Sequence, residues 1–269
     1  MSKWPEFVSA AREAAFEAGK MLKQGLSEAR EILFKGTIDL VTNFDRKAQE
    51  MIFDRLSRSF PEHGFLAEEG LNYQEKKDFR WIIDPLDGTT NYAHGVPIFC
   101  VSIALEFKGT IILGVVYDPM QGEMFHAVHG EGAYLGESRI HVSSEVDLGR
   151  SLVATGFPYD VRVNPDNNAI HFNSFLTRAQ AIRRCGSAAL DLGYVACGRF
   201  DGFWELRLHP WDVAAGGLIV REAGGRLSDF SGKELNIYRP EALATNGLIH
   251  ESMIQVIRLG KEHAENKGQ

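Results

Sequence analysis

The sequence has few cysteines, no long apolar run and no excess of positive charge, and each absence excludes a class of protein. Cys100, Cys185 and Cys197 lie far apart without a CxxC pair, so neither a disulfide framework nor a zinc site is expected. No stretch reaches the roughly eighteen uncharged apolar residues of a membrane span. The net charge of -7 disfavours a general nucleic-acid-binding surface.

Targeting and nucleotide-binding patterns are also missing. The N-terminal stretch MSKWPEFVSAAREAAFEAGK has neither the apolar core nor the cleavage site of a secretory signal, which with the unpaired thiols predicts a cytoplasmic location. The chain contains no GxGxxG, GxxxxGK[ST] or D-x-[DN]-x-[DN]-G pattern. Dinucleotide, P-loop and EF-hand sites are therefore not supported.

The apolar residues that are present predict a layered α/β (α+β) protein. A chain of 269 residues, 44% of them hydrophobic, is long enough for one large domain or two closely packed halves. Periodicity and capping residues predict a mixture of helices and strands, with an antiparallel meander in the middle of the chain and mixed sheets rather than a doubly wound order. The predicted helices cover residues 5–28, a segment that starts at 42–45 and ends before Pro61, and 187–198, 210–223 and 250–264; the predicted strands cover 64–67, 81–83, 98–107, 110–119, 123–130, 132–136, 151–157, 181–186, 202–208 and 242–246.

The stretch WIIDPLDGTTN (81–91) places two carboxylates at the end of an apolar strand. We predict that the strand ends at Asp84, because Pro85 cannot continue the ladder of hydrogen bonds. Asp84 and Asp87 would then face one point, with the carbonyl of Leu86 as a third oxygen ligand for a hard cation such as Mg²⁺. Taken alone, residues 84–88 are also explained by an Asp-Pro turn in which Asp87 caps the following helix.

Residues on both sides of this stretch favour the cation site. Gly88 permits close approach to the backbone, and Thr89-Thr90 suits a helix N-cap whose amides bind phosphate. Glu68 also follows an apolar strand-like run, and Asp212 precedes a helix rich in small residues. Three such carboxylate positions in an acidic chain suit a multi-metal phosphate site.

These motifs resemble those of the inositol monophosphatase family of Mg²⁺-dependent, lithium-sensitive sugar phosphatases. The resemblance runs in order along nearly the whole chain and is closest to the bacterial branch, which includes the inositol phosphatases described as extragenic suppressors. The matching segments are KGTIDLVTNFD (35–45), GFLAEEG (64–70), WIIDPLDGTTN (81–91), GVVYDP (114–119), RRCGSAALDLGYVACGRFDGFWE (183–205) and PWD-x4-G (210–217).

The resemblance implies a fold and a quaternary state. The fold would be a layered αβαβα sandwich of the sugar-phosphatase type with mixed sheets, forming one catalytic unit over residues 1–269. Two subdomains are expected within it: residues 1–145 with the larger sheet and the metal and phosphate motifs, and residues 146–269 with the second sheet, the substrate residues and Asp212. The family also implies a homodimer.

The resemblance further implies two to three Mg²⁺ ions per site, with Mn²⁺ as a substitute and Li⁺ as an inhibitor. Glu68, Asp84 and the Leu86 carbonyl match the ligands of the first ion. Asp84, Asp87 and Asp212 match those of the second, and Glu68 matches the third through waters. The simpler alternatives are a solvent-facing Glu69 beside Glu68, and an Asp212 that caps a helix or faces a basic neighbour.

Other positions match the catalytic and substrate-binding residues of the family. Asp45 and Thr89 match the pair that positions the nucleophilic water, and Lys35 matches a lysine on a loop that closes near the third ion. Gly88 and Thr89 match the phosphate-binding turn, while Gly186, Ser187, Ala188 and Glu205 match contacts to the hydroxyls of the substrate ring. The simpler alternatives are a helix-start Asp45, a solvated Lys35 and a Glu205 paired with Arg207.

The implied activity is hydrolysis of myo-inositol monophosphate, a small phosphorylated polyol, by direct attack of a metal-activated water. Fructose 1,6-bisphosphate and other small sugar or nucleotide phosphates are alternative substrates within the same superfamily. A haloacid dehalogenase-type phosphatase is disfavoured, because its D-x-D pattern is replaced by D-x-x-D with Pro85 interposed. The alternative from a different class is an additional regulatory binding role in a bacterial transcription complex.

Overall fold

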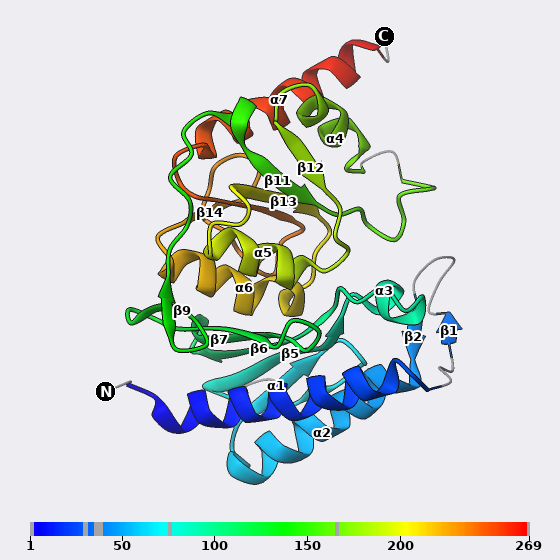
Figure 1. The fold of residues 1–269 in the computed structure, drawn as a ribbon, viewed down its shortest axis with the longest axis vertical. Coiled ribbons are helices and arrows are strands. Elements are labelled where there is room, and N and C mark those ends of the chain that lie inside the picture. Colours follow the sequence, from blue (N-terminus) through cyan, green and yellow to red (C-terminus); the bar gives the residue numbers. More distant parts are fainter. Residues whose placement is uncertain (1–2, 29–31, 35–39, 75–76, 165–166, 268–269) are drawn as a thin grey trace.

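Layers of helices and strands alternate through the fold in the order αβαβα, as Figure 1 shows. The computed structural model describes residues 3–28, 32–34, 40–74, 77–164 and 167–267. Helices α1 (Pro5–Gly25) and α2 (Asn43–Ser59) form one outer layer, and α4 (Ala169–Leu176) and α7 (His250–Lys267) form the other. Helices α5 (Ala188–Ala196) and α6 (Pro210–Glu222) lie between the two sheets. The predicted layered architecture with mixed sheets is confirmed.

The larger sheet carries the first half of the candidate site. Its eight strands lie in the order β10-β9-β8-β7-β6-β5-β3-β4, and only β3 and β5 are paired in parallel. The predicted antiparallel meander is confirmed over β6 to β9. The bounds are β3 (Gly64–Ala67), β4 (Asn72–Tyr73), β5 (Phe79–Asp87), β6 (Cys100–Phe107), β7 (Thr110–Asp118), β8 (Glu123–Val128), β9 (Gly132–Leu135) and β10 (Ser138–Ile140).

The smaller sheet has five strands in the order β12-β11-β13-β15-β14, with β11 parallel to β12 and β13, and β15 antiparallel to β13 and β14. A separate antiparallel pair, β1 and β2, precedes α2, and the short helix α3 follows β5. The bounds are β11 (Leu152–Thr155), β12 (Ala181–Arg183), β13 (Gly202–Leu206), β14 (Arg226–Ser228), β15 (Glu241–Thr245), β1 (Ile32–Phe34), β2 (Leu40–Thr42) and α3 (Thr89–Ala93).

The middle helical layer is apolar on all sides because it packs against a sheet on each face. Residues 213–220 of α6 are all buried, as are residues 188–193 of α5. Small residues bring α6 against the backbone of β7: a Cβ built on Gly114 would lie 2.6 Å from the carbonyl oxygen of Ala215. The position of α6, and of the carboxylate at its start, therefore depends on this close contact.

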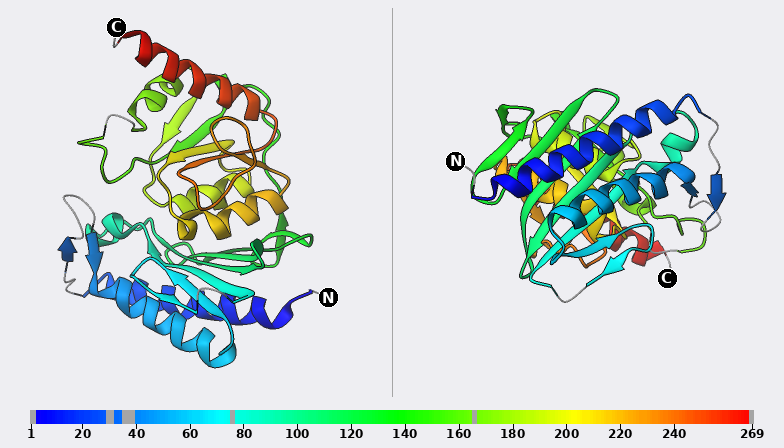
Figure 2. Two further views of the ribbon diagram at one scale, coloured as in Figure 1. Left: turned by 180° about the vertical axis from the view of Figure 1, so that it is seen from behind. Right: turned by 90° about the horizontal axis from the view of Figure 1, so that it is seen from below.

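The outer helices are amphipathic. α1 buries Phe7, Ala11, Ala18 and Leu22 on the face toward the larger sheet, and Pro5 lies in its first turn as predicted. Figure 2 shows α1 and α2 side by side below that sheet. On the opposite side of the molecule, Met253 and Ile257 of α7 pack over Trp204 and Leu243 of the smaller sheet. Among the described residues, no helix is long and apolar enough to cross a membrane.

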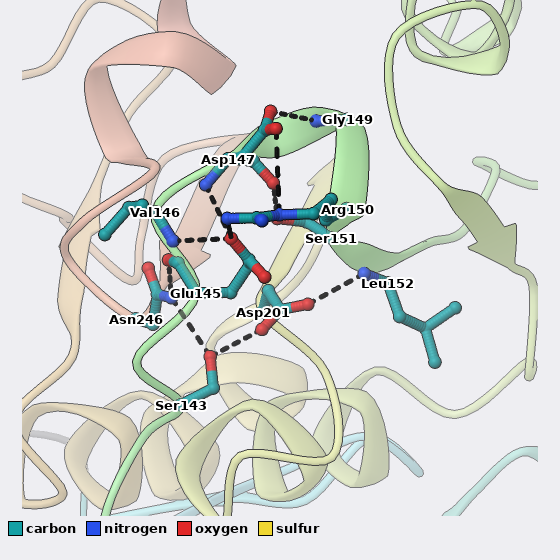
Figure 3. A network of polar contacts seen from close by, with 10 residues as sticks. All are labelled: Ser143, Glu145, Val146, Asp147, Gly149, Arg150, Ser151, Leu152, Asp201 and Asn246. Carbon is teal, nitrogen blue, oxygen red and sulfur yellow. Dashed lines mark hydrogen bonds and ion pairs between the residues drawn. The ribbon is translucent and has the colours of Figure 1, made fainter.

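A polar network fastens the segment that crosses from the larger sheet to the smaller one (Figure 3). Asp201 accepts hydrogen bonds from Ser143 Oγ at 2.5 Å and from the Leu152 amide at 2.7 Å. Asn246 donates from Nδ2 to Ser143 Oγ and to the Glu145 carbonyl. The crossing chain is thus fixed to the ends of β11, β13 and β15 before the second sheet begins.

Candidate metal and phosphate site

The two aspartates of the central motif are presented by a bulge, and not by the end of a strand. β5 continues through Asp87, whereas the sequence predicted an end at Asp84; that prediction is wrong. Asp84 pairs with Ser102 and Asp87 with Cys100, so Pro85 and Leu86 together oppose one residue of β6. The extra residue accommodates a proline that has no amide to donate, and it turns both carboxylates toward the middle layer.

Gly88 follows the bulge in a left-handed conformation, with φ of 99°. A Cβ at this position would lie 2.9 Å from the carbonyl oxygen of Ile98, so only glycine fits the turn. Gly88 is also the N-cap of α3, and Thr89 is the first residue of that helix. The prediction that Thr89-Thr90 caps the helix is therefore corrected by one residue.

The structure brings the side chains of Asp45 and Thr89 into contact. Thr89 Oγ1 lies 2.9 Å from Asp45 Oδ1 and 3.0 Å from the Leu86 carbonyl oxygen, and both are acceptors for its hydroxyl. Asp45 Oδ2 accepts from the amide and the hydroxyl of Thr42, in the capping box that starts α2. Burial raises the pKa of Asp45, while the hydrogen bonds from Thr42 and Thr89 lower it. The helix-capping alternative for Asp45 is thus realised together with the contact to Thr89.

The second half of the site comes from the starts of α5 and α6. Ser187 caps α5, and Asp87 Oδ2 accepts hydrogen bonds of 2.7 Å from Ser187 Oγ and from the Ala189 amide. Asp212 lies in the first turn of α6, where its Oδ2 accepts from the His209 amide at 2.6 Å. A carboxylate of the larger sheet is therefore held by the N-terminus of a helix from the other half of the chain.

These groups surround one pocket of ≈ 360 Å³. Asp45 lies behind Thr89 and is fully buried. Lys35 lies outside the described residues. The other predicted site residues all line the pocket: Glu68, Asp84, Leu86, Asp87, Gly88, Thr89, Gly186, Ser187, Ala188, Glu205 and Asp212.

The carboxylates of the pocket repel one another. Burial raises the pKa of Asp84 well above its usual value, and the charges of Glu68, Asp87 and Asp212 raise it further. The pKa of Asp212 is also raised well above the usual value, first by burial and then by Asp87. Burial of several neighbouring carboxylates is unfavourable, and a hard divalent cation would relieve their repulsion.

The donor set therefore suits Mg²⁺ in chemistry, while its side chains are turned toward protein partners. In the described part of the chain, no three His, Cys, Asp or Glu side chains form a ready group for a metal ion. The reason lies in the hydrogen bonds above: Asp84 Oδ1 binds the Leu86 amide at 2.9 Å, and Asp87 and Asp212 each commit one oxygen.

Two further carboxylates line the pocket: Glu205, which the sequence assigned to substrate binding, and Asp191, which sequence reasoning missed. Burial raises the pKa of Glu205 to about 8, with contributions from Asp191 and Asp87 and an opposing one from Arg184. Asp191 is buried within α5, and its Oδ1 has no hydrogen-bond partner among the described residues. An aspartate inside a helix of otherwise apolar and small residues was the available signal. Arg207, the partner suggested for Glu205, forms an ion pair with Asp160.

Comparisons with known proteins point to one family. A profile described as the inositol monophosphatase family matches residues 3–262. The chain is similar to inositol-1-monophosphatase from Mesorhizobium japonicum, with 41% identity over 91% of this chain and 94% of that protein. It is similar to Nus factor SuhB from Salmonella typhimurium, with 42% identity over 91% and 93% of the two chains.

A solved structure gives the same result for the fold. The crystal structure of the extragenic suppressor protein suhB from Bartonella henselae superimposes with a TM-score of 0.89. It is 41% identical in sequence, and the match covers 94% of this chain and 98% of that one.

Proposed function

The chain belongs to the inositol monophosphatase family and is thus a phosphoric monoester hydrolase, and on this premise we propose that it hydrolyses myo-inositol monophosphate with Mg²⁺ as the cofactor. The observation that carries the proposal is the meeting of separate motifs in one pocket. Carboxylates from β5, from the end of β3 and from α6 lie around the Gly88-Thr89 turn.

We assign the cations to the oxygens that sequence reasoning singled out. Glu68, Asp84 and the Leu86 carbonyl would hold the first ion, and Asp84, Asp87 and Asp212 the second. Glu68 would reach a third through water. Bound Mg²⁺ supplies charge neutralisation for the phosphoryl group and lowers the pKa of a coordinated water. The mutual repulsion of the buried carboxylates supports this assignment.

Asp45, Thr89 and Gly88 act on the attacking water and on the phosphate. The Thr89 hydroxyl donates to Asp45, which leaves the lone pairs of Oγ1 to accept a hydrogen bond from a water in the pocket. Gly88 lines the pocket at the start of α3, and we assign the phosphate to the backbone of this turn. A water held by Asp212 is the proposed donor of the proton to the leaving alkoxide, and Asp212 itself stays ionised.

The hydroxyls of the substrate ring are assigned to Glu205 and the turn Gly186-Ser187-Ala188. These residues line the same pocket, and Glu205 offers acceptor oxygens to ring hydroxyls. Lys35, proposed to act near the third ion, falls outside the described residues.

The assay that tests the proposal is phosphate release from a panel of monoesters, compared by kcat/KM with Mg²⁺ and with EDTA. We expect the highest kcat/KM for myo-inositol monophosphate. Mn²⁺ should partly restore the activity that is lost in EDTA, and Li⁺ should inhibit the reaction. A clear preference for fructose 1,6-bisphosphate or a nucleotide phosphate would overturn the substrate. Release that is equal in EDTA would overturn the role of the metal.

A second candidate function is supported by the name of the Salmonella relative, Nus factor SuhB. It is an additional regulatory binding role in a bacterial transcription complex, and a homodimer is the proposed assembly in either case. Co-sedimentation of the purified chain with a bacterial RNA polymerase elongation complex tests that role. Absence of binding would exclude it. A monomeric mass by light scattering would exclude the dimer.

A further inference from the structure

The wall of the pocket that faces Glu205 is the segment of residues 155–160, here called the wall segment. It leaves β11 at Thr155 and lines the pocket along its whole length. It contains no metal ligand and does not include the phosphate-binding turn. Gly156 lies so close to Glu205 that a Cβ built there would be 2.0 Å from Oε1. The path of the wall segment therefore limits where the Glu205 carboxylate can lie.

A buried asparagine fixes the start of the wall segment. Asn168 is fully buried and donates from Nδ2 to Thr155 Oγ1 and to the Gly156 carbonyl, both at 2.6 Å. Its Oδ1 accepts from the indole nitrogen of Trp204 at 2.8 Å. Since Trp204 can only donate and the Gly156 carbonyl can only accept, these partners determine the orientation of the amide.

Thr155 closes a ring of hydrogen bonds around this asparagine. Its hydroxyl donates to the Trp204 carbonyl at 2.6 Å, across the register pair that joins β11 and β13. Trp204 directly precedes Glu205 in β13, so the same ring holds both the wall segment and the strand that carries Glu205. Thr155, Asn168 and Trp204 are all buried, so a hydrogen bond lost from this ring would leave a buried polar group without its partner.

The position of Asn168 shows that its side chain is diverted from an ordinary role. It occupies the N-cap of α4, where asparagine is among the preferred residues, yet it makes no capping hydrogen bond. Asn167 Oδ1 accepts from the Ala169 amide in its place, at 2.9 Å.

An ion pair fixes the far end of the wall segment. Asp160 Oδ2 accepts from Arg207 Nη1 at 2.5 Å and from Asn164 Nδ2 at 2.9 Å. Arg207 has φ of 63°, a left-handed conformation that is unfavourable for a residue with a side chain, and its amide donates to the Pro240 carbonyl. The chain accepts this conformation just beyond the end of β13, where it places the guanidinium at the wall segment.

We propose that the wall segment determines which alcohol portion of a phosphate monoester the pocket accepts, and that Asn168, Asp160 and Arg207 are the positioning residues that hold it against Glu205. This inference rests on the proposed phosphatase function and adds to it a determinant of specificity away from the metal and the phosphate. The ligand chemistry concerned is a ring bearing several hydroxyls, which Glu205 can bind only if its carboxylate is held in place.

The test uses Asp160→Asn, which keeps the shape of the side chain and removes its charge. We expect the ratio of kcat/KM for myo-inositol 1-phosphate to that for p-nitrophenyl phosphate, which has no ring hydroxyls, to fall by about fivefold or more. The loss should appear mainly as a higher KM for the inositol ester, a split that a general loss of folded enzyme would not produce. The matched control is Glu251→Gln, which removes the remote Arg226–Glu251 ion pair of 2.8 Å and should leave the ratio unchanged.

Asn168→Asp tests the other end of the wall segment in the same assay, with thermal melting to follow folding. A carboxylate cannot donate to Thr155 and Gly156, so the same fall in the ratio is expected. If this buried variant does not fold, Asp160→Asn alone decides. An unchanged ratio in Asp160→Asn, with both esters hydrolysed, would overturn this inference alone. Absence of Mg²⁺-dependent release by the unaltered chain would overturn the proposed function and the inference with it.

Discussion

Ser187 Oγ donates a 2.7 Å hydrogen bond to Asp87 Oδ2, across a separation of 100 residues in the chain. The donor caps α5 in the middle layer, and the acceptor lies in the bulge of the larger sheet. This contact orients a proposed metal ligand with a hydroxyl assigned to substrate binding. Metal affinity and the docking of α5 onto the larger sheet are thus linked at one atom.

Ser187→Ala should weaken both the binding of Mg²⁺ and the docking of α5 onto the larger sheet. Loss of a hydrogen bond to a ligand carboxylate is expected to raise the half-activating Mg²⁺ concentration about tenfold. Loss of the helix cap should lower the free energy of unfolding by about 1 kcal/mol. Activity titrations with Mg²⁺ and chemical denaturation measure the two effects. Ser187→Thr, which keeps the hydroxyl, is the control, and equal Mg²⁺ activation of the two variants would contradict the linkage.

Asp87→Asn should abolish most of the activity, because an amide in place of the carboxylate removes one negative charge from the ligands of the proposed second ion. We expect phosphate release to fall roughly 100-fold or more at saturating substrate. Asp54→Asn is the control: it removes an exposed charge paired with Arg58 on α2, and such pairs contribute little. Unchanged phosphate release by Asp87→Asn would contradict the assignment of the metal site.

Thr89→Val should remove the hydroxyl that joins Asp45 to the pocket while keeping the size of the side chain. We expect kcat to fall by roughly 100-fold, because a single positioned hydrogen-bonding group is commonly worth that much in a transition state. Thr89→Ser keeps the hydroxyl and should recover most of the rate. Steady-state kinetics on both variants decides, and equal kcat values would show that the hydroxyl is not used.

Gly156→Ala should displace the Glu205 carboxylate, since the new methyl group would lie 2.0 Å from Oε1. The expected result is a KM for myo-inositol 1-phosphate raised by about tenfold, with a smaller change in kcat. A KM equal to that of the unaltered enzyme would mean that the carboxylate moves without consequence for substrate binding.

Glu205→Gln should alter how stability depends on pH in the metal-free protein. The pKa of Glu205 is raised from 4.5 to about 8 in the folded state. The unfolded chain therefore releases this proton at a lower pH than the folded one, and the folded state loses relative stability as pH rises from about 4.5 to about 8. In EDTA, the melting temperature of Glu205→Gln should rise relative to that of the unaltered protein as the pH increases over this interval. A constant difference between them would contradict the raised pKa.

The sequence predicted the parts of the fold that have a strong local pattern. The alternating strands of the meander and the helices with an apolar face lie where their periodicity places them. Strands β4 and β14 have two and three residues and helix α4 has eight, so none of them carries enough residues for a period to be read. These elements exist because neighbouring strands or helices complete them.

The site was predictable in composition and only partly in geometry. The carboxylates were identified because their residue types and their place in the motifs carry the chemistry. The bulge at Pro85 was not predicted, since it depends on pairing with β6, and the role of Asn168 depends on its contacts with Trp204 and Thr155. Contacts between distant parts of the chain decide both, and local sequence does not contain them.

The contact between Gly114 and Ala215 gives a strand residue with no chemistry of its own an influence on catalysis. A methyl group at 114 would push α6 away from β7, and Asp212, at the start of that helix, would move with it. In a genetic screen for loss of function, position 114 should therefore be recovered together with the proposed ligands. Tolerance to mutation in this enzyme is then governed by the spacing of its layers as much as by distance from the substrate.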